Sequence, residues 1–361
     1  MSYQTSIHFD PTALLIIKKE VDNSIQQVET AVNSLIEDQS LPFGIDDALI
    51  QFEQCAQVLM LIDMPHLSQL TQYAAELMRK IMLNPRQIKT QDVVALSEGT
   101  TMLRRYIEFI CLREVRVPQF LLDTINNLEI ALGKPVTPEG QPILSSLECI
   151  EPKFSLPQAP ELEKSIFIHK LYKLSLQKIL NQQETELDQQ ALKIVGTYLA
   201  HLAQTKPTQQ YWGLVHVAFN QIENLALSDA RLRTLISIET NIANFFSSPN
   251  DFKVELIDLA NVLCLCISQD DDQSHQIREQ ANIGEDLLTD SQLQVFSRHL
   301  FGPDFETIHV ASKLITEEMT QIRNEIEFNY QNMPEDKIAE IKTKLFNLAN
   351  VFKVMNLNEA F

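Results

Sequence analysis

The segment AQVLMLIDM, Ala56–Met64, has a counterpart near the other end of the chain, ANVFKVMNL, Ala349–Leu357. Ala and Val are identical in the two copies, and the other aligned pairs, such as Gln/Asn, Ile/Met and Asp/Asn, are mostly conservative. Each copy follows a long amphipathic segment, residues 11–37 in the first case and 306–330 in the second. A helix pair that is used twice indicates a duplicated bundle module.

Outward from the first copy, the chain reads as a bundle of five helices over residues 1–134. Asp10 and Pro11 form a helix start, with an N-cap acceptor followed by proline in the first turn. Gly133 marks the end of the fifth helix. Short turns between amphipathic helices are typical of an antiparallel bundle. One apolar stripe at three- and four-residue steps follows the first start: Leu14, Ile17, Val21, Ile25, Val28, Val32 and Leu35.

Residues 135–160 are rich in proline and predict a linker between domains. A middle helical domain is expected over residues 161–300, and an incomplete second helix pair over residues 301–361. No stretch alternates with a period of two, so the prediction is an all-α chain. The expected helices of the middle domain are 161–182, 185–204, 208–224, 229–246 and 250–268.

Composition narrows the function classes. The net charge of −19 disfavours binding to nucleic acid or to anionic membranes, because phosphates would be repelled. The 5 cysteines are an odd number and lie mostly in apolar helical stretches, and no signal peptide begins the chain, so a cytoplasmic protein without membrane insertion is expected. The pair Cys264-x-Cys266 lacks the further ligands of a metal site, and no metal or other cofactor is expected.

Catalytic motifs are missing from the sequence, which has no P-loop, GxGxxG, GxSxG or HExxH. Phosphotransfer needs an accessible histidine, commonly with Lys three and Gly four positions later. His275 comes nearest, with Arg278 and Glu279 at these places, and an exposed structural role is favoured for it and for His66. The expectation is therefore that the chain is not an enzyme. None of the 8 histidines has the pattern: His8, His66, His169, His201, His216, His275, His299 and His309.

Two pairs of residues are candidates for partner binding. Arg104 and Arg105 could hold a partner's carboxylates through bidentate contacts. Equally, one arginine could pair with Glu108 or Glu98 inside the bundle while the other is solvated. For Tyr211-Trp212, a place in a helical core is favoured over an exposed anchor.

These residues also carry a family resemblance. MLRRYIEFICLREVRVPQFLLDTINNLEIALGKP, Met102–Pro135, resembles the FimL scaffold proteins of type IV pilus systems and the N-terminal region of ChpA, the hybrid histidine kinase of the pilus chemosensory pathway. FIHKLYKLSLQKI, Phe167–Ile179, and the stretch from Phe301 to Leu357 are similar to them as well. The kinase, receiver and CheW-like regions of ChpA are missing from this chain.

The resemblance implies degenerate histidine-phosphotransfer-like bundles in tandem. Aligned with the usual His-x-x-Lys-Gly, the histidine position holds Glu53 in the first copy and Phe346 in the second. Neither residue can accept a phosphoryl group in this role. The face with Glu53, Gln57 and Met60 could still dock a receiver without reacting.

By the same resemblance, the chain is expected to be a scaffold of twitching motility that binds a response regulator or a polar landmark protein and promotes cAMP-linked output. One alternative is an active phosphotransfer protein that uses an unrecognised histidine. Another is a structural module that forms a homodimer, because the chain ends at Phe361, where helices that complete the last bundle are expected.

Overall fold

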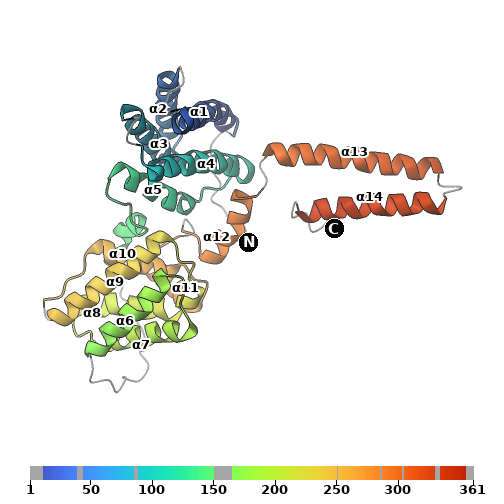
Figure 1. Cartoon of the computed structure of the whole chain (residues 1–361). Helices are drawn as coiled ribbons and strands as arrows, with labels where there is room; N and C mark the ends of the chain where they lie inside the picture. The colour runs from blue at the N-terminus through green and yellow to red at the C-terminus, as the bar shows by residue number, and fades with distance from the viewer. Residues whose placement is uncertain are drawn as a thin grey trace. The chain divides into compact units, whose positions relative to one another are not determined.

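The computed structural model is helical throughout the residues that it describes, in which no strand occurs (Figure 1). The prediction of an all-α chain is confirmed. By compactness the chain divides into two units, residues 1–296 and residues 297–361. The described residues are 11–38, 44–84, 88–149, 165–249, 251–284, 287–302, 305–329 and 334–354, which leaves the predicted N-cap Asp10 outside.

The first bundle occupies the N-terminal part of the larger unit. Helix α2 packs against α1 and α3, whereas α4 packs against α1, α3 and α5, so α2 and α4 lie diagonally across the bundle. Val21, Ile25 and Val28 of the predicted stripe on α1 are buried. The elements are α1 (Pro11–Asp38), α2 (Ile45–Leu61), α3 (Pro65–Leu83), α4 (Thr90–Arg113), the 3-10 helix η2 (Pro118–Leu121) and α5 (Leu122–Leu132).

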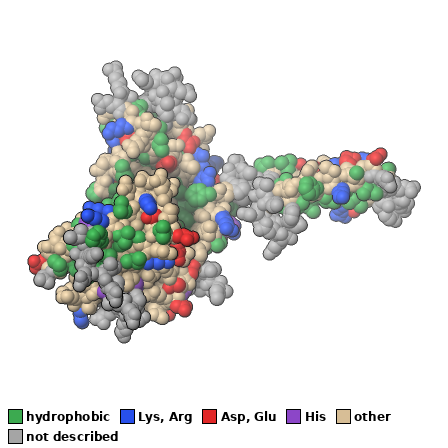
Figure 2. Space-filling view, turned by 60° about the horizontal axis from the view of Figure 1, so that its bottom comes forward, with side chains coloured by type: hydrophobic (Ala, Val, Ile, Leu, Met, Phe, Trp, Pro, Cys, Tyr) green, Lys and Arg blue, Asp and Glu red, His purple; other side chains and the backbone are tan. Residues whose placement is uncertain are grey.

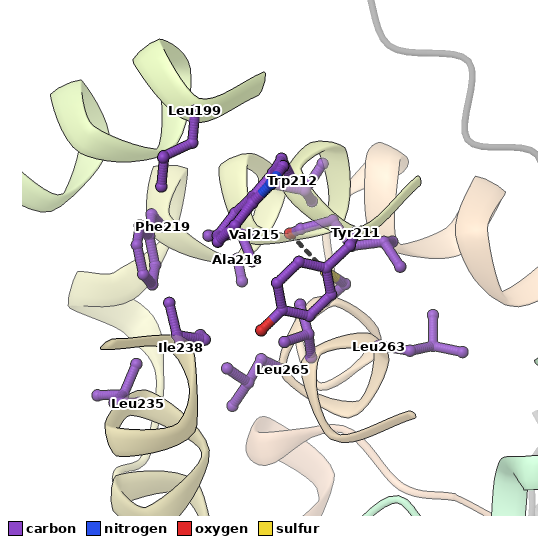
Figure 3. Close-up of a cluster of buried hydrophobic side chains, with 14 of the residues drawn as sticks. Leu199, Tyr211, Trp212, Val215, Ala218, Phe219, Leu235, Ile238, Leu263 and Leu265 are labelled. Carbon is purple, nitrogen blue, oxygen red and sulfur yellow. Dashed lines mark hydrogen bonds between the residues drawn. The ribbon is translucent and has the colours of Figure 1, made fainter. Parts of the chain in front are cut away.

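The second bundle of this unit has a core of aromatic and aliphatic side chains (Figure 3). Helix α10 contacts η3, α8, α9 and α11, and its residues 262–267 are apolar and buried without a break, as expected for a central helix. The elements are η3 (Gln141–Cys149), α6 (Ser165–Leu180), α7 (Glu186–Leu202), α8 (Lys206–Asn220), η4 (Ile222–Asn224), α9 (Asp229–Ser247), α10 (Leu256–Ile267) and α11 (Asp272–Gln280). Helix α12 (Asp290–Leu300) begins in this unit and crosses its boundary at residue 296.

Tyr211 and Trp212 are part of this core, as favoured from the sequence. Both side chains are buried, and the Trp212 ring stacks on Phe252 with 5.6 Å between the ring centres. The Tyr211 hydroxyl accepts a hydrogen bond of 2.9 Å from Nδ2 of Asn241. The pair therefore packs helices and does not anchor a partner.

The segment predicted to be a linker contributes to the second bundle. Ile143 and Leu147 on η3 are buried in the same core as Trp212. Gly140, just before η3, donates its backbone N–H to Oδ1 of Asn261 on α10 over 2.8 Å. The rest of the proline-rich segment, from residue 150 onward, lies outside the described residues.

A buried charge network joins three segments that are distant in sequence. Arg231 on α9 is within 3.2 Å of Glu139 and 2.7 Å of Asp290, and it also donates to the carbonyl oxygen of Ala226. Burial lowers the pKa of Arg231, but Glu139 and Asp290 outweigh it and raise the pKa above the ordinary value. Burial raises the pKa of Glu139, although Arg231 is beside it. Arg231 thus attaches two other segments to α9: the start of α12 and the residues before η3.

The smaller unit contains a helical hairpin. Helices α13 (Phe305–Asn329) and α14 (Glu335–Val354) pack against each other, and Lys344 pairs with Glu325 between them at 2.7 Å. Among the hairpin residues whose side chains are described, the buried apolar ones are Ile322, Ile341 and Leu348. No helix in the described ranges has the length and apolar character needed to cross a membrane.

The contact at Gly140 allows a first prediction. A Cβ atom at this residue would lie 2.6 Å from backbone atoms of Ala260 and Asn261. We expect Gly140→Ala to lower the free energy of unfolding by about 1–3 kcal/mol, because backbone has to shift to relieve the clash. Urea denaturation, monitored by circular dichroism, measures this change in the free energy of unfolding. Gly284→Ala is the control, since a Cβ there meets nothing within 4 Å. Equal stability of the two variants would contradict the packing described.

A second prediction concerns Arg231. Arg231→Met leaves two buried carboxylates without their cation, so we expect a loss of about 3–5 kcal/mol in the free energy of unfolding at neutral pH. The exposed Lys253 provides a control, since Lys253→Met removes the same charge from the same bundle at a cost within about 0.5 kcal/mol.

The loss in Arg231→Met should depend on pH. Folding raises the pKa of Glu139, so the stability linked to its protonation is present below the unfolded pKa and is lost as pH rises through the folded pKa. Removal of the cation raises this folded pKa further. The deficit relative to the wild type should therefore shrink between pH 7 and pH 5, and a deficit that stays constant or grows would contradict the role of Glu139.

Candidate partner-binding surface

Helix α2 carries the position at which the first copy lacks a histidine. Glu53 is half-exposed there and points toward α3, where its carboxylate oxygen Oε1 accepts a bond of 2.5 Å from Nη2 of Arg79. Ala56, aligned with the usual lysine, is buried in the bundle. The predicted phosphoacceptor position thus holds a carboxylate in an ion pair.

The outer face of α2 carries four exposed large apolar side chains. Leu61 is 84% exposed and Met60 58% exposed, and Ile50 and Val58 are exposed on the same helix. Ile50, Val58 and Leu61 follow each other at steps of eight and three residues, which places them on one side of the helix. Gln57, predicted for partner binding, is exposed between them. We call these six residues the α2 face: Ile50, Glu53, Gln57, Val58, Met60 and Leu61.

Sequence reasoning named three of these residues, Glu53, Gln57 and Met60, and missed the most exposed one. Leu61 belongs to the repeated segment AQVLMLIDM, in which an apolar run of this kind reads as core. The sequence did contain a signal for its exposure. Leu61 is eleven residues from Ile50, so both lie on the side of the helix opposite Phe52 and Leu59, which are buried.

The two arginines of α4 lie apart from this face. Arg104 reaches α1, where it is 3.7 Å from Asp22 and 3.3 Å from Glu29. The sequence had offered Glu108 or Glu98 as partners, but Glu108 pairs with Lys18 at 3.1 Å, and Glu98 accepts a bond from an asparagine of α5. Arg105 is exposed. Since α2 and α4 are diagonal in the bundle, the arginines and the α2 face form two separate surfaces.

The histidine nearest to a phosphotransfer pattern is exposed but lacks a free cation beside it. Arg278, three residues after His275, donates 2.8 Å bonds from Nε to the carbonyl oxygen of Ile267 and from Nη1 to that of Leu287. A guanidinium committed to carbonyl groups is poorly placed to attract a phosphoryl group. His66 is exposed, whereas His216 is buried.

The second copy presents an aromatic surface in place of a reactive group. Phe346 on α14 is 68% exposed, while Leu348 beside it is buried between the helices. Figure 2 shows hydrophobic side chains on the surface of this hairpin, next to charged ones. A phenyl ring has no nucleophilic atom, so this position can take part in packing only.

Metal and thiol chemistry find no support among the described residues. No cluster of three or more His, Cys, Asp or Glu that could hold a metal ion occurs among the described residues. Cys264 and Cys266 are buried in α10, and burial raises the pKa of both thiols well above the ordinary value. Thiols of this kind are unreactive, because the thiolate is the nucleophile and the ligand.

Comparison with known proteins identifies a curated relative. Neither a protein-family model nor a solved structure matches the chain. A curated relative is the scaffold protein FimL of Pseudomonas aeruginosa, 23% identical over 368 aligned residues that cover 97% of this chain. The chain spans 64% of the length of that relative. The resemblance to FimL seen in the sequence is confirmed, and the chain is similar to a scaffold protein along nearly its whole length.

Proposed function

We propose that the chain is a non-catalytic cytoplasmic scaffold of type IV pilus signalling, and that its α2 face binds the receiver domain of a response regulator. The similarity to the scaffold protein FimL supports the general role. The observation that carries the specific part is the exposed apolar side of α2, with Leu61 and Met60 at its C-terminal end. Polar landmark proteins are the second class of partner, and cAMP-linked output is the proposed consequence of the assembly.

The chemistry of the α2 face suits binding better than solvation. Burial of exposed leucine, isoleucine and methionine side chains is favourable in proportion to the apolar area removed from water. Contiguous exposed apolar groups on a helix are typical of an interaction site. Ile50, Val58 and Leu61 would act as anchors along the helix axis, with Gln57 supplying a polar contact between them.

Binding at this face would leave a phosphorylated receiver intact. The carboxylate of Glu53 already accepts a bond from Arg79, and this ion pair holds it on the side of α3. A receiver that docks here would meet a carboxylate where a phosphotransfer protein offers an imidazole. The proposed scaffold therefore holds its partner without removing the phosphoryl group.

The third prediction tests the α2 face. We expect Leu61→Arg and Met60→Arg each to weaken binding of a purified receiver domain of the pilus system by tenfold or more, because a charge would be buried at the centre of the contact. Fluorescence anisotropy with a labelled receiver gives the dissociation constants. Glu53→Arg should weaken binding too, since it also breaks the pair with Arg79.

The matched control is Ile130→Arg, which introduces the same charge at an exposed isoleucine of α5 in the same bundle. Its affinity should equal that of the wild type. If the α2 variants bind as tightly as this control, the interface is elsewhere, and Arg104 and Arg105 are the next residues to change. Transfer of radiolabel from a phosphorylated receiver to any histidine would refute the non-catalytic role.

The helical hairpin supports a second candidate, a homodimer built by the smaller unit. Helical spacing places Met319 and Ile326 on one side of Ile322 in α13. It places Ile338 and Leu345 on the same side of α14, because the two helices run antiparallel. All four side chains are exposed, so the hairpin presents an apolar groove flanking its small core: Met319, Ile326, Ile338 and Leu345.

A second copy of the hairpin would cover this groove as a four-helix bundle. The fourth prediction is that Ile326→Glu and Leu345→Glu convert a dimer of the full chain to a monomer, as measured by light scattering coupled to gel filtration. Val351→Glu is the control, since this exposed residue lies on the opposite side of the core residue Ile341 from Ile338 and Leu345. A wild-type chain that is monomeric at high micromolar concentration would rule out the dimer.

A further inference from the structure

The second bundle contains a cavity of about 590 Å³ that belongs to neither surface discussed above. It lies where the segment after α8, the segment after α10 and the start of α12 meet. The backbone N–H of Asp290 donates to the carbonyl oxygen of Ser268 over 2.8 Å, which holds two of these segments together. The volume is in the range of sites for small ligands, so a side chain and part of the backbone that carries it could enter. Its lining is Gln221, Glu223, Asn224, Leu225, Ala226, Ser268, Gln269, Asp270, Asp271, Asp290, Ser291 and Gln294.

The charge of this lining is entirely negative, with four carboxylates and no lysine or arginine. Three of the carboxylates have strong internal partners. Glu223 pairs with Lys193 at 2.6 Å, Asp290 pairs with Arg231, and Asp271 accepts bonds from backbone N–H groups at the start of α11. Asp270 forms no ion pair among the described residues and accepts a hydrogen bond from the hydroxyl of Ser291. One carboxylate at the cavity is therefore open to a cation.

Two buried polar atoms of the lining have no hydrogen-bond partner among the described residues. One is a donor and the other is an acceptor. Gln269 is only 9% exposed, and its donor Nε2 has no hydrogen-bond acceptor in the described part of the chain. The second oxygen of Asp290, Oδ1, is buried and has no donor there. Buried polar groups in native proteins nearly always pair with protein, water or a ligand, so this donor and this acceptor are available to a group that enters the cavity.

The two requirements together select the ligand. A cation is needed for Asp270, and a hydrogen-bond donor is needed for Oδ1 of Asp290, whose other oxygen pairs with Arg231. A hydrogen-bond acceptor is needed for Nε2 of Gln269. A metal ion or a protonated polyamine supplies no acceptor, and an inorganic anion supplies no positive charge. A basic residue within a polypeptide supplies both, through its side chain and its own backbone carbonyl group.

We propose that this cavity binds an arginine side chain presented by a segment of a partner protein. The planar guanidinium offers several donors in a fixed arrangement, which suits two carboxylates better than the single ammonium of lysine. The Gln269 amide would then donate to a carbonyl oxygen of the bound segment. The inference does not depend on receiver binding at the α2 face, which is on a different bundle.

The fifth prediction uses defined peptides and the full chain. Acetyl-Gly-Arg-Gly-amide is titrated against the protein, and the methyl signal of Ala226, which lines the cavity, is followed by NMR. We expect saturable shifts, with affinity about tenfold higher than for the same peptide carrying citrulline, which has nearly the same shape but no charge. The lysine peptide should bind with intermediate affinity.

Two variants locate the binding. Asp270→Asn keeps the shape and the acceptor for Ser291 but removes the free charge, and Gln269→Leu removes the unpartnered donor. Each variant should lower the affinity for the arginine peptide several-fold, while the unfolding temperature stays unchanged or rises. Asp251→Asn is the control, because Asp251 is an exposed acid of the same bundle outside the cavity lining.

Several results would overturn the proposal. These are equal affinity for the arginine and citrulline peptides, no shift of Ala226 with any peptide, and equal affinity for wild type, Asp270→Asn and Asp251→Asn. Stronger binding of spermidine or Mg²⁺ than of the arginine peptide would identify a polyamine or metal site instead. None of these outcomes bears on receiver binding, which the Leu61 and Met60 variants test separately.

Discussion

The burial of Arg231 is the constraint on which the larger unit depends. A guanidinium taken out of water must have anionic partners close by, and here they come from Glu139 before η3 and Asp290 at the start of α12. The chain between Glu139 and Asp290 contains the helices α6 to α11. The network therefore joins the beginning and the end of the second bundle through ion pairs, in addition to the apolar core. It also fixes Asp290 at the edge of the acidic cavity, with one oxygen engaged and the other unpartnered.

Helical periodicity was enough to predict most of the helices, because their apolar stripes are long and can be recognised from the local sequence alone. The expected helix at 208–224 is α8, and the core position of Trp212 followed from its apolar neighbours. Helix α11 was not predicted, since its residues are mostly polar and its position depends on contacts distant in sequence. Arg278 fixes it through the carbonyl oxygen of Ile267, an interaction that no periodicity reveals.

The proline-rich segment and the α2 face are two regions whose burial and contacts could not be predicted from the sequence. Prolines at 135–160 indicated a linker, but Ile143 and Leu147 are buried, because two apolar residues one turn apart suffice to dock a short 3-10 helix. On α2 the sequence located Glu53, Gln57 and Met60. It could not find Arg79 as the partner of Glu53, since that pair spans 26 residues. Nor could it separate an exposed Leu61 from a buried one, because the same side chain serves a core and an interface equally well.

The two proposed surfaces of the larger unit differ in physical character, and this difference suits a scaffold. The α2 face would bind by burial of apolar area, which salt affects little. The cavity would bind by charge, and a net charge of −19 attracts basic segments and repels acidic ones at long range. A partner that met both surfaces would gain from the raised effective concentration at the second site. Two partners with opposite requirements would not compete for one surface, so the chain could hold both at once without any chemistry of its own.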